Sequence, residues 1–97
     1  MKELQKQFSG IGQVKGYDFN QITATPYGYI YIKTSLEGSN TFEVFKRLEN
    51  PLYNVVSYPT DKAFGKWAWA VGTLERANEV LAEITIKKKE NISITQS

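Results

Sequence analysis

Cysteine and histidine are both absent from this sequence of 97 residues. Without cysteine the chain has no disulfide, no thiolate nucleophile and no sulfur ligand for zinc or iron. Without histidine it has no imidazole to act as a general base near neutral pH, and no histidine ligand for a metal or a haem. These two absences exclude most familiar active sites. We therefore expect no enzymatic activity, no cofactor and no bound metal.

Long apolar runs are absent as well. No run approaches the roughly 18 residues that a membrane span needs, and the polar stretch Met1–Phe8 has no apolar core of a secretion signal. We expect a cytoplasmic protein that does not contact a membrane. The chain has the length of one domain, because a second core would leave each half below the size at which chains usually fold alone.

A strong excess of charge of one sign is absent, since the net charge is +2 and arises from the C-terminal residues 87–97. The sequence has 12 Lys and Arg residues against 10 Asp and Glu residues, and residues 87–97 contain three of these lysines and one glutamate. Residues 1–86 are therefore neutral. A protein dedicated to duplex DNA normally shows a basic stripe on its folded surface, since phosphate neutralisation provides most of its affinity. The run Lys87–Lys89 is typical of a solvated polar end.

Runs of aromatic and β-branched residues between turn residues predict a sheet of consecutive strands. After residues 1–13, which fit either a flexible lead-in or a short edge element, these runs predict four strands. Their connections are mostly too short for the crossover that a parallel pair requires, which favours an antiparallel meander. The predicted strands are 14–23, 27–34, 41–48 and 53–58.

The segment between these strands and the C-terminal part predicts a helical turn and a further strand. Thr60 fits the cap of a single turn through Phe64, and Gly65 fits its left-handed stop. The stretch 67–71 alternates large and small side chains, which predicts a fifth strand with both indoles on one face, or the start of a helix. Trp67 and Trp69 fit either core packing under the helix or the lining of a ligand slot.

Residues 73–86 form the one convincing helical pattern. Thr73 is a good N-cap, and one apolar stripe contains Leu74, Ala77, Val80, Leu81 and Ile84. Residues 84–86 also fit a strand, and residues 87–97 predict a polar tail, of which 91–97 is either an edge strand or disordered. The predicted architecture of this single domain, residues 1–97, is α+β: an antiparallel meander of four to five strands at 14–71 with one C-terminal helix packed on one face.

Tyrosine recurs at every second position of the second predicted strand. Tyr27, Tyr29 and Tyr31 share one face with Lys33, and the isoleucines between them point the other way. A single helix of about 13 residues is roughly 20 Å long and covers only one side of such a sheet. If it packs on the isoleucine face, the tyrosine face is uncovered. We therefore predict a partner-binding surface made of Tyr27, Tyr29, Tyr31, Lys33, Phe45 and Arg47.

Three uses of this face are open from the sequence. Tyrosines can pack across strands with their hydroxyls in water, they can anchor a protein partner or a second copy of the chain, or they can stack on unpaired bases while cations contact phosphates. We favour a small non-enzymatic accessory domain that binds a protein or associates with itself as a homodimer. The alternative is single-stranded nucleic-acid binding by the same face, with help from Lys87–Lys89.

One part of the chain resembles other sequences. Tyr58–Trp69, read as Y-P-T-D-K-A-F-G-K-W-A-W, together with Thr73–Ala77 and Phe42–Arg47, resembles short uncharacterised proteins of bacterial phages and mobile elements. The resemblance covers about a third of the chain and implies no activity, so it assigns no functional residue. The predicted order of four strands and a helix is also similar to that of dimeric transcription coactivators that bind single-stranded DNA, a likeness of topology alone.

Overall fold

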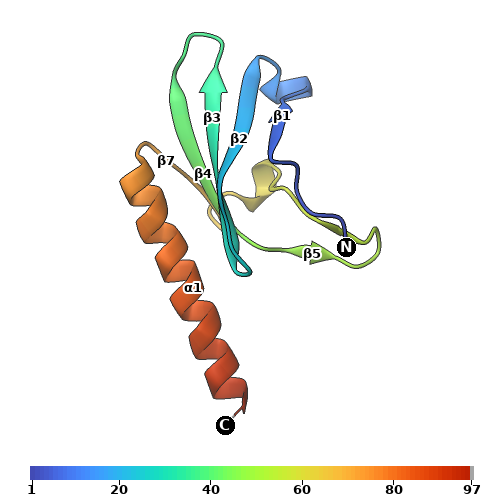
Figure 1. Ribbon diagram of the computed structural model, residues 1–97, viewed down its shortest axis with the longest axis vertical. Coiled ribbons are helices and arrows are strands. Elements are labelled where there is room, and N and C mark those ends of the chain that lie inside the picture. The colour runs from blue at the N-terminus through green and yellow to red at the C-terminus, as the bar shows by residue number, and fades with distance from the viewer. Residues whose placement is uncertain (97) are drawn as a thin grey trace.

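A five-stranded antiparallel sheet with one long helix against it forms the frame of the molecule (Figure 1). The computed structural model describes residues 1–96, and the side chains of residues 1–12 and 14–90. The predicted α+β class, an antiparallel meander with one C-terminal helix, is confirmed. The strands lie side by side in the order β1 (Gln7–Ser9), β2 (Tyr17–Ala24), β3 (Gly28–Ser35), β4 (Asn40–Lys46) and β7 (Ala68–Val71).

A long excursion separates β4 from β7 in the chain. It contains a hairpin of two short strands, β5 (Glu49–Asn50) and β6 (Val55–Val56), and the 3-10 helix η2 (Asp61–Ala63). The predicted strand 53–58 is wrong as a member of the main sheet, because Asn54 takes a positive φ of 54° and Pro59 ends the extended run. The place beside β4 belongs to β7 instead.

The connections of the sheet contain one further short element and a left-handed glycine. A 3-10 helix, η1 (Gly12–Val14), links β1 to β2. After η2, Gly65 adopts φ +89°, a conformation that favours glycine, and it stops the helical turn as predicted. The lead-in at 1–13 proves to hold an edge strand, the second of the two predicted alternatives.

The helix α1 (Leu74–Gln96) is longer than the sequence predicted. Thr73 caps it, because its Oγ1 accepts a hydrogen bond from the Arg76 N–H at 3.1 Å. The end predicted at residue 86 is wrong. Residues 87–90 are good helix formers, and the sequence from Leu74 onward has no glycine or proline to end the helix. Residue 97 of the predicted tail lies outside the described residues.

The helix packs on the face of the sheet that carries Ile30 and Val44, as predicted. Gly28 permits the close approach, since a Cβ there would lie 2.5 Å from the Phe45 carbonyl oxygen and 3.0 Å from Leu81 Cδ1. The predicted apolar stripe of the helix is buried except for Leu74, which is 40% exposed in the first turn. Its buried members are Ala77, Val80, Leu81 and Ile84.

Candidate functional site

Three residues of the predicted partner-binding surface are buried inside the protein. Tyr29, Tyr31 and Phe45 expose 2%, 0% and 0% of their surface. The Phe45 ring stacks against both tyrosines, with ring centroids 5.4 Å and 5.7 Å apart. Their side chains are therefore core, and the expectation that this face is uncovered is wrong. Two segments outside α1 cover it: the N-terminal segment, and the excursion between β4 and β7, which contributes Tyr58, Phe64 and Trp67. The sequence-based prediction counted only the helix as cover.

The first cover is the N-terminal segment at residues 2–6, which crosses the tyrosine face in an extended form and which we call the strap. The Lys2 N–H donates to the Asn54 carbonyl oxygen at 2.8 Å, and the Val56 N–H donates to the Lys2 carbonyl oxygen at 2.9 Å. The Tyr31 hydroxyl donates to the Gln5 carbonyl oxygen at 2.6 Å. These bonds join residues far apart in the sequence, and they hold the strap over the sheet.

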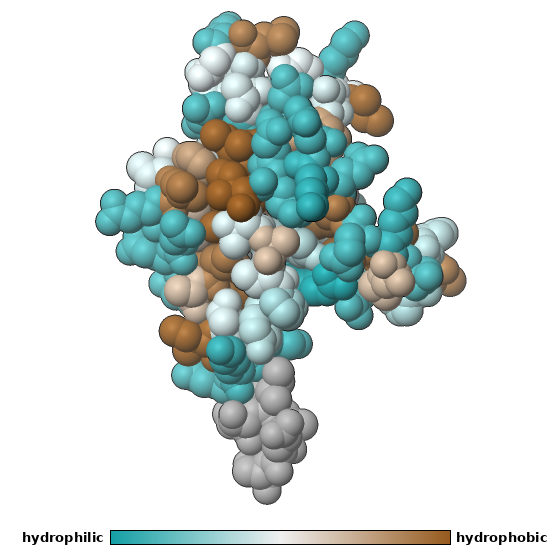
Figure 2. Space-filling model, viewed as in Figure 1, coloured by the Kyte–Doolittle hydropathy of each residue, from teal (hydrophilic) through white to brown (hydrophobic). Residues whose placement is uncertain are grey.

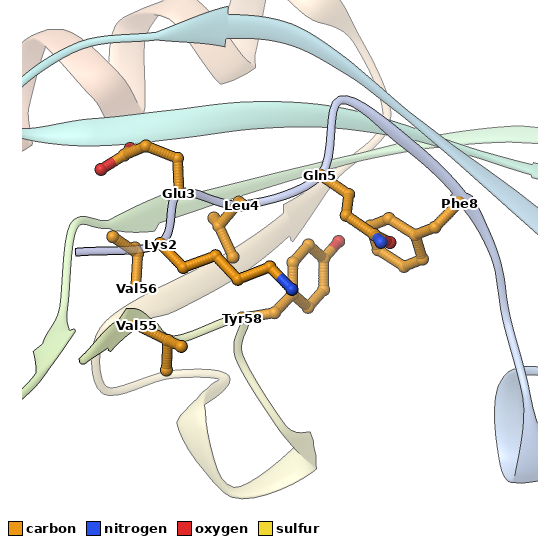
Figure 3. A pocket seen from close by; sticks show the side chains of 8 residues that line it. All are labelled: Lys2, Glu3, Leu4, Gln5, Phe8, Val55, Val56 and Tyr58. Atoms are coloured by element: carbon orange, nitrogen blue, oxygen red, sulfur yellow. The ribbon is translucent and has the colours of Figure 1, made fainter. Parts of the chain in front are cut away.

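The side chains under the strap are mainly apolar. Figure 3 shows Leu4 and Phe8 beside the ring of Tyr58, while the Glu3 side chain points away from that ring. The rings of Phe8 and Tyr58 meet edge to face, with centroids 5.2 Å apart. An open pocket of about 350 Å³ is left between the strap and β6, with mostly apolar lining. This pocket lies where the strap packs against the sheet.

Arg47, another predicted site residue, fastens the strap. Its guanidinium binds both carboxylate oxygens of Glu3 at 2.7 Å, and its Nη1 also donates to the Tyr29 hydroxyl oxygen at 2.5 Å. The hydrogen bonds from Arg47 lower the pKa of Glu3 to about 2, against a smaller opposing effect of burial. Burial, followed by the hydrogen bond to Glu3, raises the pKa of Tyr29. The positive charge of Arg47 is thus largely neutralised by the carboxylates of the same chain.

The remaining predicted site residues, Tyr27 and Lys33, lie apart from each other. Tyr27 precedes β3 and packs with the helix cluster, so its predicted place on the same face as Tyr29 is wrong. The turn before the strand breaks the alternation on which that prediction depended. Lys33 keeps the predicted face, with its Nζ 4.4 Å from the centre of the Tyr17 ring.

A cationic groove lies on the helix side of the sheet. It consists of two adjoining hollows of about 190 Å³ and 340 Å³ that share Lys46, Ile84 and Lys87. The hollows lie where the helix passes the end of β4 and the strand β7. Six residues of cationic type line the groove, although the guanidinium of Arg47 itself is bound to Glu3 on the other face: Lys46, Arg47, Lys66, Arg76, Lys87 and Lys88. Two half-buried rings, Tyr27 and Trp69, line it as well.

The helical period explains why lysines enter this groove. Lys87 and Lys88 come three and four residues after Ile84, so they continue the face of α1 that packs on the sheet. This face changes from apolar to cationic at the point where β4 ends with exposed Lys46. The Arg47 N–H donates to the Tyr27 carbonyl oxygen at 2.9 Å, which fixes Tyr27 next to the same end.

The charges of the groove are poorly balanced. Glu83 is the one carboxylate among the described lining residues, and it lies 4.0 Å from Arg76. Arg47 pairs with Glu3. Within the part of the chain that the structure describes, no ion pair within 4.0 Å involves the groove lysines, which are Lys46, Lys66, Lys87 and Lys88. The groove therefore presents a positive field to an anionic ligand.

The two indoles take different places, so the prediction of both on one face is wrong. Trp67 lies in the turn before β7 and contacts Phe45 edge to face at 6.3 Å, in the aromatic core. Trp69 lies within β7 and contributes to the helix side. The strand begins only at Ala68, so the alternation of the strand does not include Trp67.

Figure 2 shows apolar side chains gathered over the middle of the sheet, beside the start of the helix, with hydrophilic ones around them. Ile22 in β2 is 42% exposed.

Within residues 1–96 no helix is long and apolar enough to cross a membrane. The described side chains include no cluster of three or more acidic groups that could hold a metal ion. Comparison with protein-family models, with curated proteins and with solved structures gives no match for this chain.

Proposed function

We propose that the protein is a small non-enzymatic accessory domain that binds single-stranded nucleic acid in the cationic groove. The observation that carries this proposal is a set of four lysines that form no ion pair within the described residues, around one groove that also contains two half-buried rings. Lysines neutralise phosphates, and rings offer a surface on which unpaired bases stack.

The spacing of the rings favours a single strand over a duplex. Tyr27 lies next to Arg47 on the β3 side of β4, and Trp69 lies opposite Val44 on the β7 side. The two positions are two strands apart across the sheet and three residues apart along β4. Together these two components place them about 14 Å apart. Bases of a single strand can be splayed out to reach separate rings, whereas bases of a duplex stay stacked on each other.

The sequence favoured the binding of a protein partner or a second copy on the aromatic face. The burial of that face does not support this hypothesis. Tyr29, Tyr31 and Phe45 are covered by the same chain. The alternative hypothesis moves to the other side of the sheet, where Tyr27 lies beside Lys87 and Lys88 of the second half of the helix. The origin in phages or mobile elements stays a prediction.

The proposal is tested by fluorescence anisotropy with a labelled single-stranded oligonucleotide of mixed sequence, measured over a range of salt concentrations. If four lysines each neutralise one phosphate, the slope of log affinity against log salt is about −2.8. Affinity then falls about fifty-fold between about 50 mM and 200 mM salt. A duplex of the same sequence is expected to bind more weakly.

Matched double variants separate the groove from general charge. Lys46→Gln with Lys87→Gln removes two groove lysines, and the slope is expected to fall to about −1.4. Lys15→Gln with Lys62→Gln removes the same charge at exposed positions away from the groove and is expected to leave the slope unchanged. Undetectable binding at low salt, or equal losses in both double variants, contradicts the proposal. Light scattering distinguishes self-association, which shows as a doubled mass without oligonucleotide.

A further inference from the structure

A further pocket lies on the face of the sheet opposite the cationic groove. Its volume is about 340 Å³, which is in the range of pockets that bind small molecules. Four rings and two carboxylates define what we name the acidic aromatic pocket: Phe8, Phe19, Tyr58, Phe64, Glu43 and Asp61. Sequence reasoning gave no sign that these two carboxylates share a pocket, because 18 positions separate them in the chain.

Glu43 is the unusual member of this pocket. It exposes only 6% of its surface, although it carries a carboxylate. The Tyr58 hydroxyl donates to its Oε1 at 2.5 Å. Among the described residues, no ammonium or guanidinium lies within 4.0 Å of the carboxylate, and no hydrogen bond reaches Oε2. No buried side-chain polar atom of the described residues lacks a partner, so the unbonded Oε2 keeps contact with solvent and is free to accept a hydrogen bond from a ligand.

Tyr58 holds this carboxylate in a fixed position. Its ring packs edge to face with Phe8 and with Phe45, at 5.2 Å and 5.0 Å between centroids. Burial, followed by the negative charge of Glu43, raises the pKa of Tyr58. The hydroxyl therefore stays protonated and continues to donate to Glu43, which leaves Oε2 as the oxygen for a ligand.

Lys33 also lines the pocket but does not neutralise Glu43. Its Nζ lies 4.4 Å from the centre of the Tyr17 ring and 5.9 Å from the centre of the Phe19 ring, both in β2, whereas Glu43 lies in β4. Strand β3 separates β2 from β4, so two strand spacings of about 4.8 Å lie between them. The ammonium of Lys33 is thus held on the β2 side of the pocket, and among the described residues no ion pair within 4.0 Å joins it to Glu43, which leaves the carboxylate for another cation.

We propose that the acidic aromatic pocket binds an organic ammonium group, from a free alkylamine or from the lysine side chain of a peptide. The carboxylate of Glu43 accepts hydrogen bonds from the ammonium, and the exposed Asp61 adds negative charge at the edge. The ring faces attract the cation and contact its alkyl chain. This site is separate from the nucleic-acid groove, since the two lie on opposite faces of the sheet.

The test is a two-dimensional NMR titration of the full chain with three probes. n-Butylammonium represents a free amine, the N-acetyl methylamide of lysine represents a peptide side chain, and n-butanol is the neutral control. We expect saturable shifts of the Glu43 and Phe64 amides with at least one ammonium probe and not with butanol. Binding of the lysine probe alone identifies a peptide as the source, and binding of butylammonium alone identifies a small amine. Equal shifts with butanol, or no saturable shift with either ammonium probe, overturn the proposal.

Glu43→Gln provides the matched variant. Glutamine keeps the volume and the acceptor for Tyr58 but removes the charge, and the lost charge assistance weakens ammonium binding about tenfold. Its urea midpoint is expected to equal or exceed that of the wild type, and its oligonucleotide affinity is expected to be unchanged. Unaltered ammonium binding in a folded Glu43→Gln variant contradicts the proposal. If that variant does not fold, Asp61→Asn at the exposed edge is used, with a loss of about threefold expected and no loss contradicting the proposal.

Discussion

Replacing Phe45 by alanine measures whether the aromatic face is a core or a free surface. Phe45 lies at the centre of the face, fully buried, with the rings of Tyr29, Tyr31, Tyr58 and Trp67 around it at centroid distances of 5.0 to 6.3 Å. Removing this ring leaves a cavity that four neighbouring rings cannot fill without moving. A free-surface role predicts almost no loss of stability, whereas a core role predicts a large one.

The magnitude follows from the burial of the side chain. Phenylalanine-to-alanine changes in protein cores cost about 3 to 5 kcal/mol of unfolding free energy. A domain of this length has a total of about 5 to 15 kcal/mol, so the change removes a large share of it. With a urea dependence of about 1.5 kcal/mol per molar, the urea midpoint falls by about 2 to 3 M.

Urea denaturation followed by circular dichroism and by tryptophan fluorescence is the assay, since agreement of the two signals establishes a single transition. Leu52→Ala is the control, because Leu52 is 80% exposed at the tip of the β5–β6 hairpin. It is expected to change stability by no more than about 0.5 kcal/mol. A loss below about 1 kcal/mol for Phe45→Ala would refute the buried face and restore it as a binding surface.

Two further predictions concern the packing of the helix on the sheet and the ion pair that holds the strap. Gly28→Ala is expected to cost about 1 to 3 kcal/mol, because the added methyl group meets backbone and helix, and Gly72→Ala, with open space, is the neutral control for the same urea measurement. The Glu3 to Arg47 ion pair predicts acid sensitivity. The unfolded chain binds more protons between the ordinary carboxyl pKa of 4.5 and the folded value of about 2. The stability that the pair contributes is therefore present above that window and is lost as the pH falls through it. Glu3→Gln is expected to flatten this part of the stability curve, and an unchanged curve contradicts the role of the strap.

The sheet and the helix were predictable because their signals are local. The alternation through β3 and the N-cap Thr73 each depend on residues within a few positions of one another. The helix end was missed because residues 87–90 were treated as a solvated tail. Their composition is equally typical of a continuing helix, and the sequence from Leu74 onward has no residue that stops it.

The covering of the aromatic face was not predictable from local patterns. The strap is held by bonds such as that from Tyr31 to Gln5, whose partners are 26 residues apart. The strap segment at residues 2–6 has no clear alternation, and sequence alone shows no partner for it. A count of regular elements therefore underestimates the cover available to a small sheet, because irregular segments also bury aromatic rings.

The cationic groove was hidden for a related reason. Its lysines come from the end of β4, the turn before β7 and the second half of α1, so each is an ordinary surface lysine in the sequence. Counting charge along the chain gives a neutral body, and only the fold brings these cations together. Among the groove lysines, the sequence indicated only Lys87 and Lys88 as candidates for phosphate contact.

The two tryptophans allow the most direct measurement of nucleic-acid binding. Trp69 lines the cationic groove, and Trp67 lies in the aromatic core on the other face. The indole N–H signals of both residues are followed by NMR as single-stranded oligonucleotide is added at low salt. Binding in the groove predicts that the Trp69 signal shifts and saturates while the Trp67 signal stays in place. An unmoved Trp69 signal, or equal movement of both, contradicts the groove as the binding site.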